Sequence, residues 1–136
     1  MIDIFFDGLC APTNPGGVAT YGFFVVKNSE IIKQSKGVVG EGKGMTNNVA
    51  EYTGLLKAVD YVVNAYPGES EINIYGDSQL AISQMQGSYK VRSGTAKTFV
   101  PIIKKKLEGK KVTFIWVRRE ENAMADFLTK EALPEA

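Results

Sequence analysis

The sequence contains no histidine and a single cysteine, Cys10. Without histidine, the chain has no serine–histidine or cysteine–histidine catalytic pair, no histidine-ligated zinc site and no haem held by a proximal histidine. A single cysteine excludes an internal disulfide and a cysteine-rich zinc site. If the protein is a hydrolase, carboxylates or lysines must carry the chemistry, and a hard metal ion bound through oxygen is the natural partner.

Long apolar runs are absent as well. The longest, Phe23 to Val26, is far shorter than the roughly 20 residues that span a bilayer. The N-terminus begins Met1-Ile2-Asp3-Ile4 and lacks the basic and apolar regions of a signal peptide. We therefore expect a cytoplasmic protein with no membrane contact. The length of 136 residues and the hydrophobic content of 44% predict one compact domain over residues 1–136.

Charge is distributed unevenly, although the net charge is only +1. The segment from Ser88 to Lys111 carries eight basic residues against one acidic residue, Glu108, so the rest of the chain is net negative. Two interpretations remain open. The lysines form a solvated helix face, or they form a basic rim beside an acidic, cation-binding centre, as a nucleic-acid enzyme would need.

Hydrophobic periodicity and turn signals predict the order of the elements. Strands are expected at 2–7, 20–27, 31–39, 72–76 and 112–117, and helices at 47–65, 78–86, 99–108 and 122–133, with a loop at 8–17. The first three strands make an antiparallel meander, and the later strands run parallel to the first because crossovers are right-handed. The predicted fold is α/β, a mixed five-stranded sheet in the order 3-2-1-4-5 with helices on both faces.

Two aspartates end predicted strands: Asp7 the first and Asp77 the fourth. In open α/β sheets, ligands gather outside the carboxyl ends of the strands. Parallel neighbouring strands lie about 5 Å apart, so both side chains would project into one crevice. The alternative is that each aspartate only caps the turn or helix that follows, which suits Asp77 before Ser78.

Glu51 falls on the apolar side of the long predicted helix, between Ala58 and Val62 on a helical wheel. A carboxylate that faces a sheet costs several kcal/mol unless it is paired, protonated or bound to a cation. No basic residue in the predicted core elements is an obvious partner. Asp126, one turn into the last helix, is an ordinary placement for an acid. Clustered carboxylates suit a pair of Mg²⁺ ions about 4 Å apart and in-line hydrolysis of a phosphodiester.

An ordered set of short motifs covers nearly the whole chain: Asp7-Gly8, Asn14-Pro15-Gly16, Thr46-Asn47-Asn48 with Glu51, Asp77-Ser78, and Glu121-Asn122 with Asp126. In this order and in these strand and helix contexts, the set resembles type 1 ribonuclease H. The stretches 6–10 and 116–122 are most similar to the archaeal branch of that family. The resemblance implies an endonuclease that cuts the RNA strand of RNA/DNA hybrids and leaves 5′-phosphate and 3′-hydroxyl ends.

The resemblance also implies a metal centre of four carboxylates that binds two Mg²⁺ ions, or Mn²⁺. Asp7 would bridge both ions. Asp126 would share the ion that activates the attacking water, and Glu51 and Asp77 would hold the ion at the leaving 3′ oxygen. Double-stranded RNA is a possible second substrate, and no obligate protein partner is expected.

Substrate contacts follow from the same resemblance. Thr46 matches a residue that contacts a DNA phosphate, and Asn14 and Asn48 match contacts in the minor groove. The main chain near Gly8 and Leu9 would meet the 2′-hydroxyl groups, by which a protein distinguishes RNA from DNA. In place of the basic, tryptophan-containing protrusion of many bacterial relatives, this chain has a short segment with Lys90 and Arg92.

Many relatives also carry a histidine in the loop before the last acidic residue, where this chain has the segment 118–121, Arg-Arg-Glu-Glu. An arginine there would stabilise charge on the phosphate, and we favour Arg118 because it directly follows a strand. A glutamate that accepts a proton, or charges that only pair with one another, are the alternatives. Two other functions remain open: another nuclease of the same fold, or a catalytically silent nucleic-acid-binding module. Four intact carboxylates favour an enzyme, since without metal they would repel phosphate.

Overall fold

The computed structural model describes residues 1–87 and 94–135. Five strands form one sheet in the order β3-β2-β1-β4-β5, which confirms the predicted order. They are β1 (Ile2–Ala11), β2 (Val18–Lys27), β3 (Glu30–Glu41), β4 (Glu71–Gly76) and β5 (Lys111–Trp116). The first three pair antiparallel, whereas β4 and β5 run parallel to β1. The sheet is therefore mixed, as expected.

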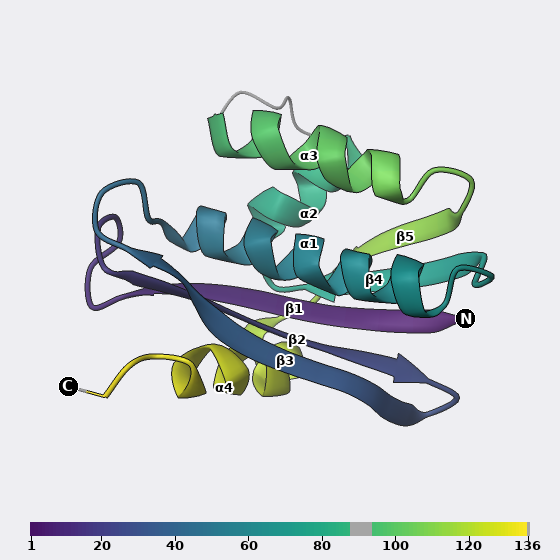
Figure 1. The fold of residues 1–136 in the computed structure, drawn as a ribbon, viewed down its shortest axis with the longest axis horizontal. Coiled ribbons are helices and arrows are strands. Elements are labelled where there is room, and N and C mark those ends of the chain that lie inside the picture. The colour runs from purple at the N-terminus through teal and green to yellow at the C-terminus, as the bar shows by residue number, and fades with distance from the viewer. Residues whose placement is uncertain (88–93, 136) are drawn as a thin grey trace.

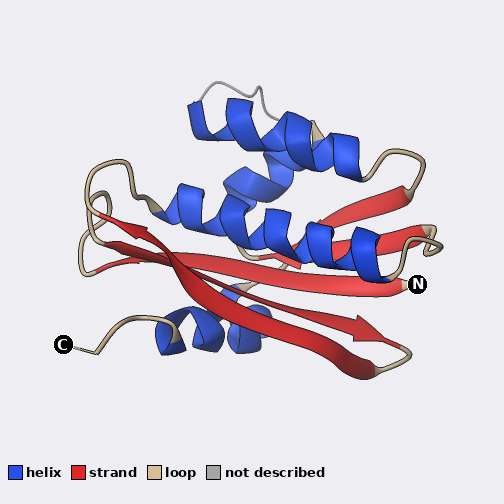
Figure 2. Ribbon diagram, viewed as in Figure 1, coloured by secondary structure: helices blue, strands red, loops and turns tan. Residues whose placement is uncertain are grey.

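The helices are α1 (Asn47–Ala65), α2 (Gln79–Gln86), α3 (Gly94–Lys106) and α4 (Ala123–Glu131), with a 3₁₀ turn at Arg119–Asn122. Figure 1 shows α1 and α2 on one face of the sheet with α3 outside them, and α4 alone on the other face. Figure 2 shows the same layers by type of element, with the sheet separating α4 from the other three helices. None of the helices in the described ranges is long and apolar enough to cross a membrane.

Local sequence explains the start of α1 and both ends of α2. The Thr46 hydroxyl accepts a hydrogen bond from the Val49 N–H at the start of α1, at 3.0 Å. The Ser78 hydroxyl does the same for the Ala81 N–H at the start of α2, at 3.1 Å, and α2 ends at Gly87 with φ +82°. Such caps satisfy backbone groups that have no partner inside the helix.

Two predicted boundaries differ from the structure by more than two residues. β1 does not end at Asp7 but continues to Ala11, because β2 pairs with it along its whole length. The segment 8–11, predicted as a loop from its glycine and proline signals, is therefore strand. The third helix starts at Gly94 rather than Phe99, so Pro101 lies inside it instead of in its first turn.

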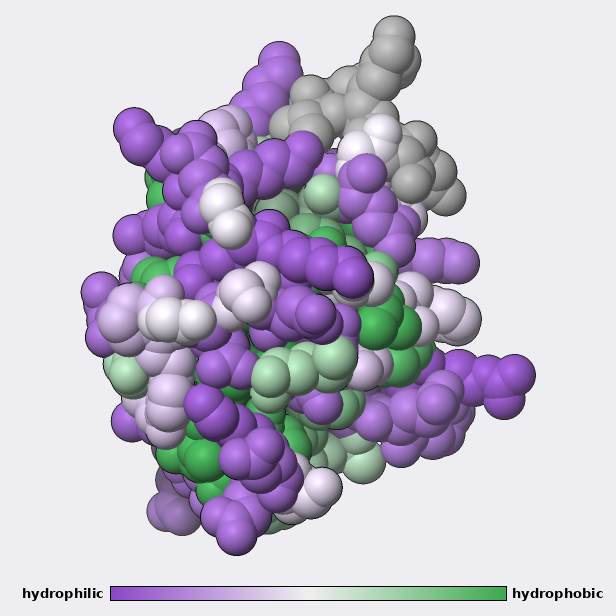
Figure 3. Space-filling view, turned by 90° about the vertical axis from the view of Figure 1, so that its right-hand side faces the viewer, coloured by the Kyte–Doolittle hydropathy of each residue, from purple (hydrophilic) through white to green (hydrophobic). Residues whose placement is uncertain are grey.

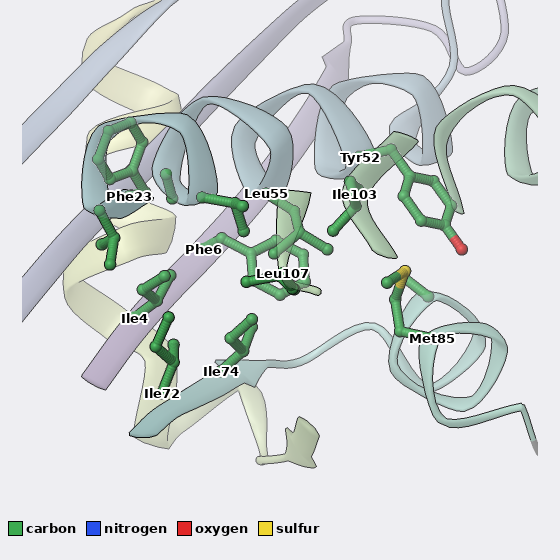
Figure 4. Close-up of a cluster of buried hydrophobic side chains, with 14 of the residues drawn as sticks. Ile4, Phe6, Phe23, Tyr52, Leu55, Ile72, Ile74, Met85, Ile103 and Leu107 are labelled. Carbon is green, nitrogen blue, oxygen red and sulfur yellow. The ribbon is translucent and has the colours of Figure 1, made fainter. Parts of the chain in front are cut away.

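The main core fills the space between the sheet and the three helices that share a face (Figure 4). Strand side chains meet the inner face of α1, and side chains from α2 and α3 close the far side. Each large aliphatic or aromatic side chain buried in this way stabilises the fold by about 1.5–3 kcal/mol. The fully buried members include Ile4, Phe6, Tyr52, Leu55, Ile72, Ile74 and Ile103.

Candidate active site

Asp7 and Asp77 become neighbours through the parallel pairing of β1 and β4. The register pairs Phe6 with Gly76. Asp7 directly follows Phe6, and Asp77 directly follows Gly76. Beyond that pair β1 continues against β2, while the chain of β4 turns away into α2. The crevice predicted at the carboxyl ends of the strands therefore opens where β4 leaves the sheet, with Asp7 inside β1 rather than at its end.

The β5 end holds the turn after β4 in place. The Val117 N–H donates to the Gly76 carbonyl at 3.0 Å, and the Trp116 indole N–H donates to the Asp77 carbonyl at 3.1 Å. Both bonds are made to the main chain, so they fix the backbone around Asp77 without using its carboxylate. The Trp116 ring is 45% exposed at this edge.

Glu51 joins the two aspartates because α1 approaches β1 unusually closely at Gly8. A Cβ atom on Gly8 would lie 2.2 Å from the Glu51 nitrogen and 2.4 Å from the Ala50 carbonyl carbon. Only glycine fits at such a distance, because both neighbouring atoms belong to the helix backbone. The close contact brings Glu51 near enough to Asp7 for its charge to raise the pKa of that aspartate, and the half-buried position of Glu51 agrees with the wheel-based prediction that it faces inward.

Asp126 arrives from the opposite face of the sheet on α4. That helix packs on β2 at Gly22, where a Cβ atom would lie 2.6 Å from the Leu128 Cβ and 2.8 Å from the Ala125 carbonyl. Asp126 is less buried than Asp7, and its Oδ2 makes an ion pair with the Lys130 amino group at 3.1 Å. The four carboxylates come from β1, from the turn that follows β4, and from two helices on opposite faces of one sheet.

Burial and mutual repulsion dominate the electrostatics of this carboxylate cluster. Burial raises the pKa of Asp7 to about 8, and the charges of Asp77, Glu51 and Asp126 add to the rise against a hydrogen bond from the Gly8 N–H. Burial raises the pKa of Glu51 to about 7, with a further contribution from Asp77. The pKa of Asp77 is also raised, first by burial. With so many carboxyl groups in one place, the ionised form of each is unfavourable unless a cation neutralises the charge.

The donor set suits a hard cation. Asp77 does not cap α2, because Ser78 does, which removes the purely structural alternative for its carboxylate. Its Oδ2 atom is buried and accepts no hydrogen bond. Carboxylate oxygens are the ligands that Mg²⁺ and Mn²⁺ prefer. Over residues 1–87 and 94–135, no three acidic or thiol side chains already surround one point as a finished metal site does.

An open groove of about 460 Å³ runs beside Glu51. Three residues predicted to contact substrate line it, namely Asn14, Thr46 and Asn48, together with Thr95 at the start of α3. The Asn48 Oδ1 atom is buried without a hydrogen-bond partner. Of the other expected contacts, Gly8 and Leu9 lie half-buried on β1, and Lys90 and Arg92 fall outside the described residues.

Asn14 has a second task in the structure, because its Oδ1 accepts a hydrogen bond from the Asn47 N–H at 3.1 Å. The Asn47 side chain in turn accepts from the Cys10 N–H at 2.7 Å. These bonds fasten the end of β1 and the loop after it to the start of α1. No sequence pattern predicts this role of Asn47, because the contact depends on the loop that brings residue 14 to the helix.

The two arginines of the loop before Asp126 differ in what they face. The charge of Arg119 lowers the pKa of both Glu51 and Asp77, so its guanidinium lies on the side of the carboxylate cluster. The Arg118 N–H donates to the Glu121 Oε1 at 3.2 Å, which fixes the turn. Because the loop forms a 3₁₀ turn at Arg119–Asn122, consecutive side chains point in different directions.

The lysine-rich segment is divided between the two ends of α3. Lys97 lies in its first turn, near the groove, whereas Lys104, Lys105 and Lys106 lie about 10 Å or more further along the helix. Lys106 forms an ion pair with Asp60 at 2.8 Å. Figure 3 views the end of the molecule that carries the N-terminus and the end of α3, and its surface is mostly hydrophilic. This half of the segment fits the solvated-face interpretation.

Known proteins resemble this chain in sequence and in structure. Residues 19–132 match the family model described as reverse transcriptase-like. The Bifunctional protein Rv2228c of Mycobacterium tuberculosis is 34% identical over 126 residues, which are 90% of this chain. The match covers 33% of Rv2228c, so the chain spans about a third of the length of that curated relative.

Three solved structures share the fold at TM-scores near 0.9. The N-terminal RNase H domain of Rv2228c has a TM-score of 0.86 and 32% identity, over 96% of this chain and 91% of that one. RNase H1 from Halobacterium salinarum has a TM-score of 0.86 and 28% identity, over 99% and 98%. LC11-RNase H1, isolated from compost and solved in complex with an RNA/DNA hybrid, has a TM-score of 0.87 and 32% identity, over 97% and 96%.

Proposed function

Because the chain belongs to the type 1 ribonuclease H family, we propose that it is an endonuclease that hydrolyses the RNA strand of RNA/DNA hybrids and leaves 5′-phosphate and 3′-hydroxyl ends. The observation that carries the proposal is the cluster of four carboxylates, Asp7, Glu51, Asp77 and Asp126, whose charges act on one another beside an open groove. LC11-RNase H1, which has the same fold, was solved in complex with an RNA/DNA hybrid.

The four carboxylates would hold two Mg²⁺ ions. Asp7 would be the central ligand, because the charges of the other three acids all raise its pKa. Bound there, the ions supply an activated water and stabilise charge on the leaving oxygen. The chain's own task is to hold the donors. Gly8 admits α1 to β1, Gly22 admits α4 to β2, and the β5 end fixes the backbone at Asp77. Such preorganisation lets charge develop on the phosphate without rearrangement of the protein.

Asn14, Thr46 and Asn48 would contact the hybrid along the groove, and Lys97 would meet a phosphate at its far rim. For the cation near the scissile phosphate we propose Arg119 in place of Arg118. Arg119 is the arginine whose charge acts on Glu51 and Asp77, and a guanidinium matches the geometry of a phosphate.

The test is cleavage of end-labelled RNA/DNA, RNA/RNA and DNA/DNA duplexes by the purified chain in Mg²⁺, in Mn²⁺ and in EDTA. We expect cleavage of the RNA strand of the hybrid in Mg²⁺, none in EDTA, and none by Asp7→Asn. Hybrid binding without cleavage, unchanged by EDTA, would indicate a catalytically silent binding module. Cleavage of DNA/DNA would indicate another nuclease of the same fold.

A further inference from the structure

Asn122 is one of the few polar side chains buried in the described residues, with 1% of its surface exposed. It is the last residue of the 3₁₀ turn and occupies the N-cap position of α4. An asparagine at this position normally accepts a hydrogen bond from the first turn of its own helix, a contact worth about 1 kcal/mol. Asn122 makes no such bond. Its side chain is therefore used elsewhere.

The amide Nδ2 of Asn122 donates to the carbonyl of Phe6 at 2.9 Å, across 116 positions of sequence. This carbonyl belongs to the peptide that leads into Asp7, and Phe6 is the last residue of β1 that is in register with β4. The amide thus holds β1 at the point where its pairing with β4 ends. The bond also settles the orientation of the amide, because a carbonyl can only accept.

Asn122 also contacts the second aspartate. A hydrogen bond from its side chain opposes the rise in the pKa of Asp77. Asp126 lies four residues further along the same helix, one turn away. One buried side chain therefore contacts the elements that carry three of the four acids: β1 before Asp7, the carboxyl group of Asp77, and the start of α4.

The remaining acceptor of Asn122 is unused. Its Oδ1 atom is buried and has no hydrogen-bond partner, and the Oδ2 atom of Asp77 is in the same condition. A buried acceptor without a partner costs about 1–3 kcal/mol, more than a cap bond would contribute. A residue chosen only to fasten α4 would not leave such an atom beside a carboxylate. The arrangement instead leaves two buried oxygen acceptors, one on Asn122 and one on Asp77, of the kind that a hydrated cation binds.

We propose that Asn122 is a positioning residue that holds Asp7 and Asp77 at the spacing the metal ions require. The proposal rests on the proposed function, since it assigns a task within that metal centre. Residues that orient metal ligands typically change metal affinity 10- to 100-fold when they are replaced. The alternative is a merely structural bond between α4 and β1.

The Asn122→Ser variant distinguishes a positioning role from a merely structural bond. Serine caps helices as well as asparagine does, so the variant can gain the cap bond that Asn122 lacks, while its shorter side chain cannot reach the Phe6 carbonyl. The matched control is Thr20→Val. Thr20 is fully buried, and its hydroxyl donates to the Thr129 carbonyl at 2.7 Å, which ties β2 to α4 without contact to the carboxylates. Asn122→Ala serves as a second variant should serine perturb the turn.

Metal affinity is measured by calorimetric titration of the folded proteins with Mn²⁺ alone, and kcat and KM are measured on a hybrid. We expect Asn122→Ser to weaken Mn²⁺ binding at least tenfold and to lower kcat with little change in KM. Thr20→Val should lower the unfolding temperature and leave Mn²⁺ binding unchanged. Equal Mn²⁺ affinity of the wild type and both Asn122 variants would overturn this proposal alone. A wild type that binds no metal would overturn the proposed function with it.

Discussion

Replacing Asp7 by asparagine should stabilise the protein in the absence of metal. Asp7 is 6% exposed, and its pKa rises from 3.8 to about 8. The unfolded chain releases the proton near pH 4, whereas the native protein keeps it until about pH 8. Over this window the native state binds more protons than the unfolded state, so stability falls as pH rises and the loss is complete above pH 8.

The size of the effect follows from the pKa shift. Each unit corresponds to about 1.4 kcal/mol, so the shift of Asp7 amounts to several kcal/mol at pH 8. Asparagine has no charge to bury, and its Oδ1 can still accept the Gly8 N–H that Asp7 accepts at 2.8 Å. We therefore expect Asp7→Asn to gain at least about 2 kcal/mol at pH 8, or roughly 5–10 °C in unfolding temperature for a domain of this size.

The assay is urea and thermal unfolding in EDTA at pH 5, 6, 7 and 8, followed by circular dichroism. The difference between Asp7→Asn and the wild type should be small at pH 5 and grow toward pH 8, and Mg²⁺ should recover part of the loss for the wild type only. Glu108→Gln, which removes one charge from an exposed position, is the control and should leave the pH slope unchanged. A parallel pH dependence for Asp7→Asn and the wild type would refute the reasoning.

Three further outcomes can be checked on single variants. Arg119→Ala should lower kcat at least tenfold, about 1.4 kcal/mol, with little change in hybrid affinity, and Arg118→Ala should cost less; the reverse order would return the role to Arg118. Gly8→Ala should destabilise the protein by about 3 kcal/mol or more in chemical unfolding, because its Cβ would meet the α1 backbone at 2.2 Å, whereas Gly68→Ala, with nothing within 4 Å, should be nearly neutral. Lys97→Gln should raise KM for the hybrid and reduce the salt dependence of KM, whereas Lys105→Gln on the same helix should do neither. Equal effects of the two substitutions would contradict a specific contact of Lys97 with the hybrid.

The sheet order and the inward position of Glu51 were predictable because both depend on local patterns. Alternating apolar residues define a strand, and right-handed crossovers leave few possible sheet orders. The inward position of Glu51 follows from helical periodicity alone, which fixes the face of each residue as soon as the helix is recognised. The predicted helix start at residue 47 and the predicted helix end at residue 86 agree with the structure, in which Thr46 and Gly87 are the caps.

What the sequence left open depends on contacts between distant segments. The glycine and proline residues after Asp7 predicted a loop, yet pairing with β2 keeps residues 8–11 in the sheet. The choice between Arg118 and Arg119 depends on the direction in which side chains leave a 3₁₀ turn, and no periodic pattern predicts that. Asn122 belongs to the Glu121-Asn122 motif, but the sequence predicts no role for it, because its partner is a backbone carbonyl in the first strand.

The bond between Asn122 and Phe6 also has a consequence for how the protein comes into being. It joins the first strand to the last helix, and Asp126 lies beyond it in the chain. A chain emerging from the ribosome can already pair β1 with β2 and β3, but it has only three of the four acids until α4 has been made. Contacts over such sequence separations form slowly, since loop closure must be completed first. Cleaving activity should therefore arise only after synthesis of the whole domain, and nascent chains should be harmless to the hybrids they encounter.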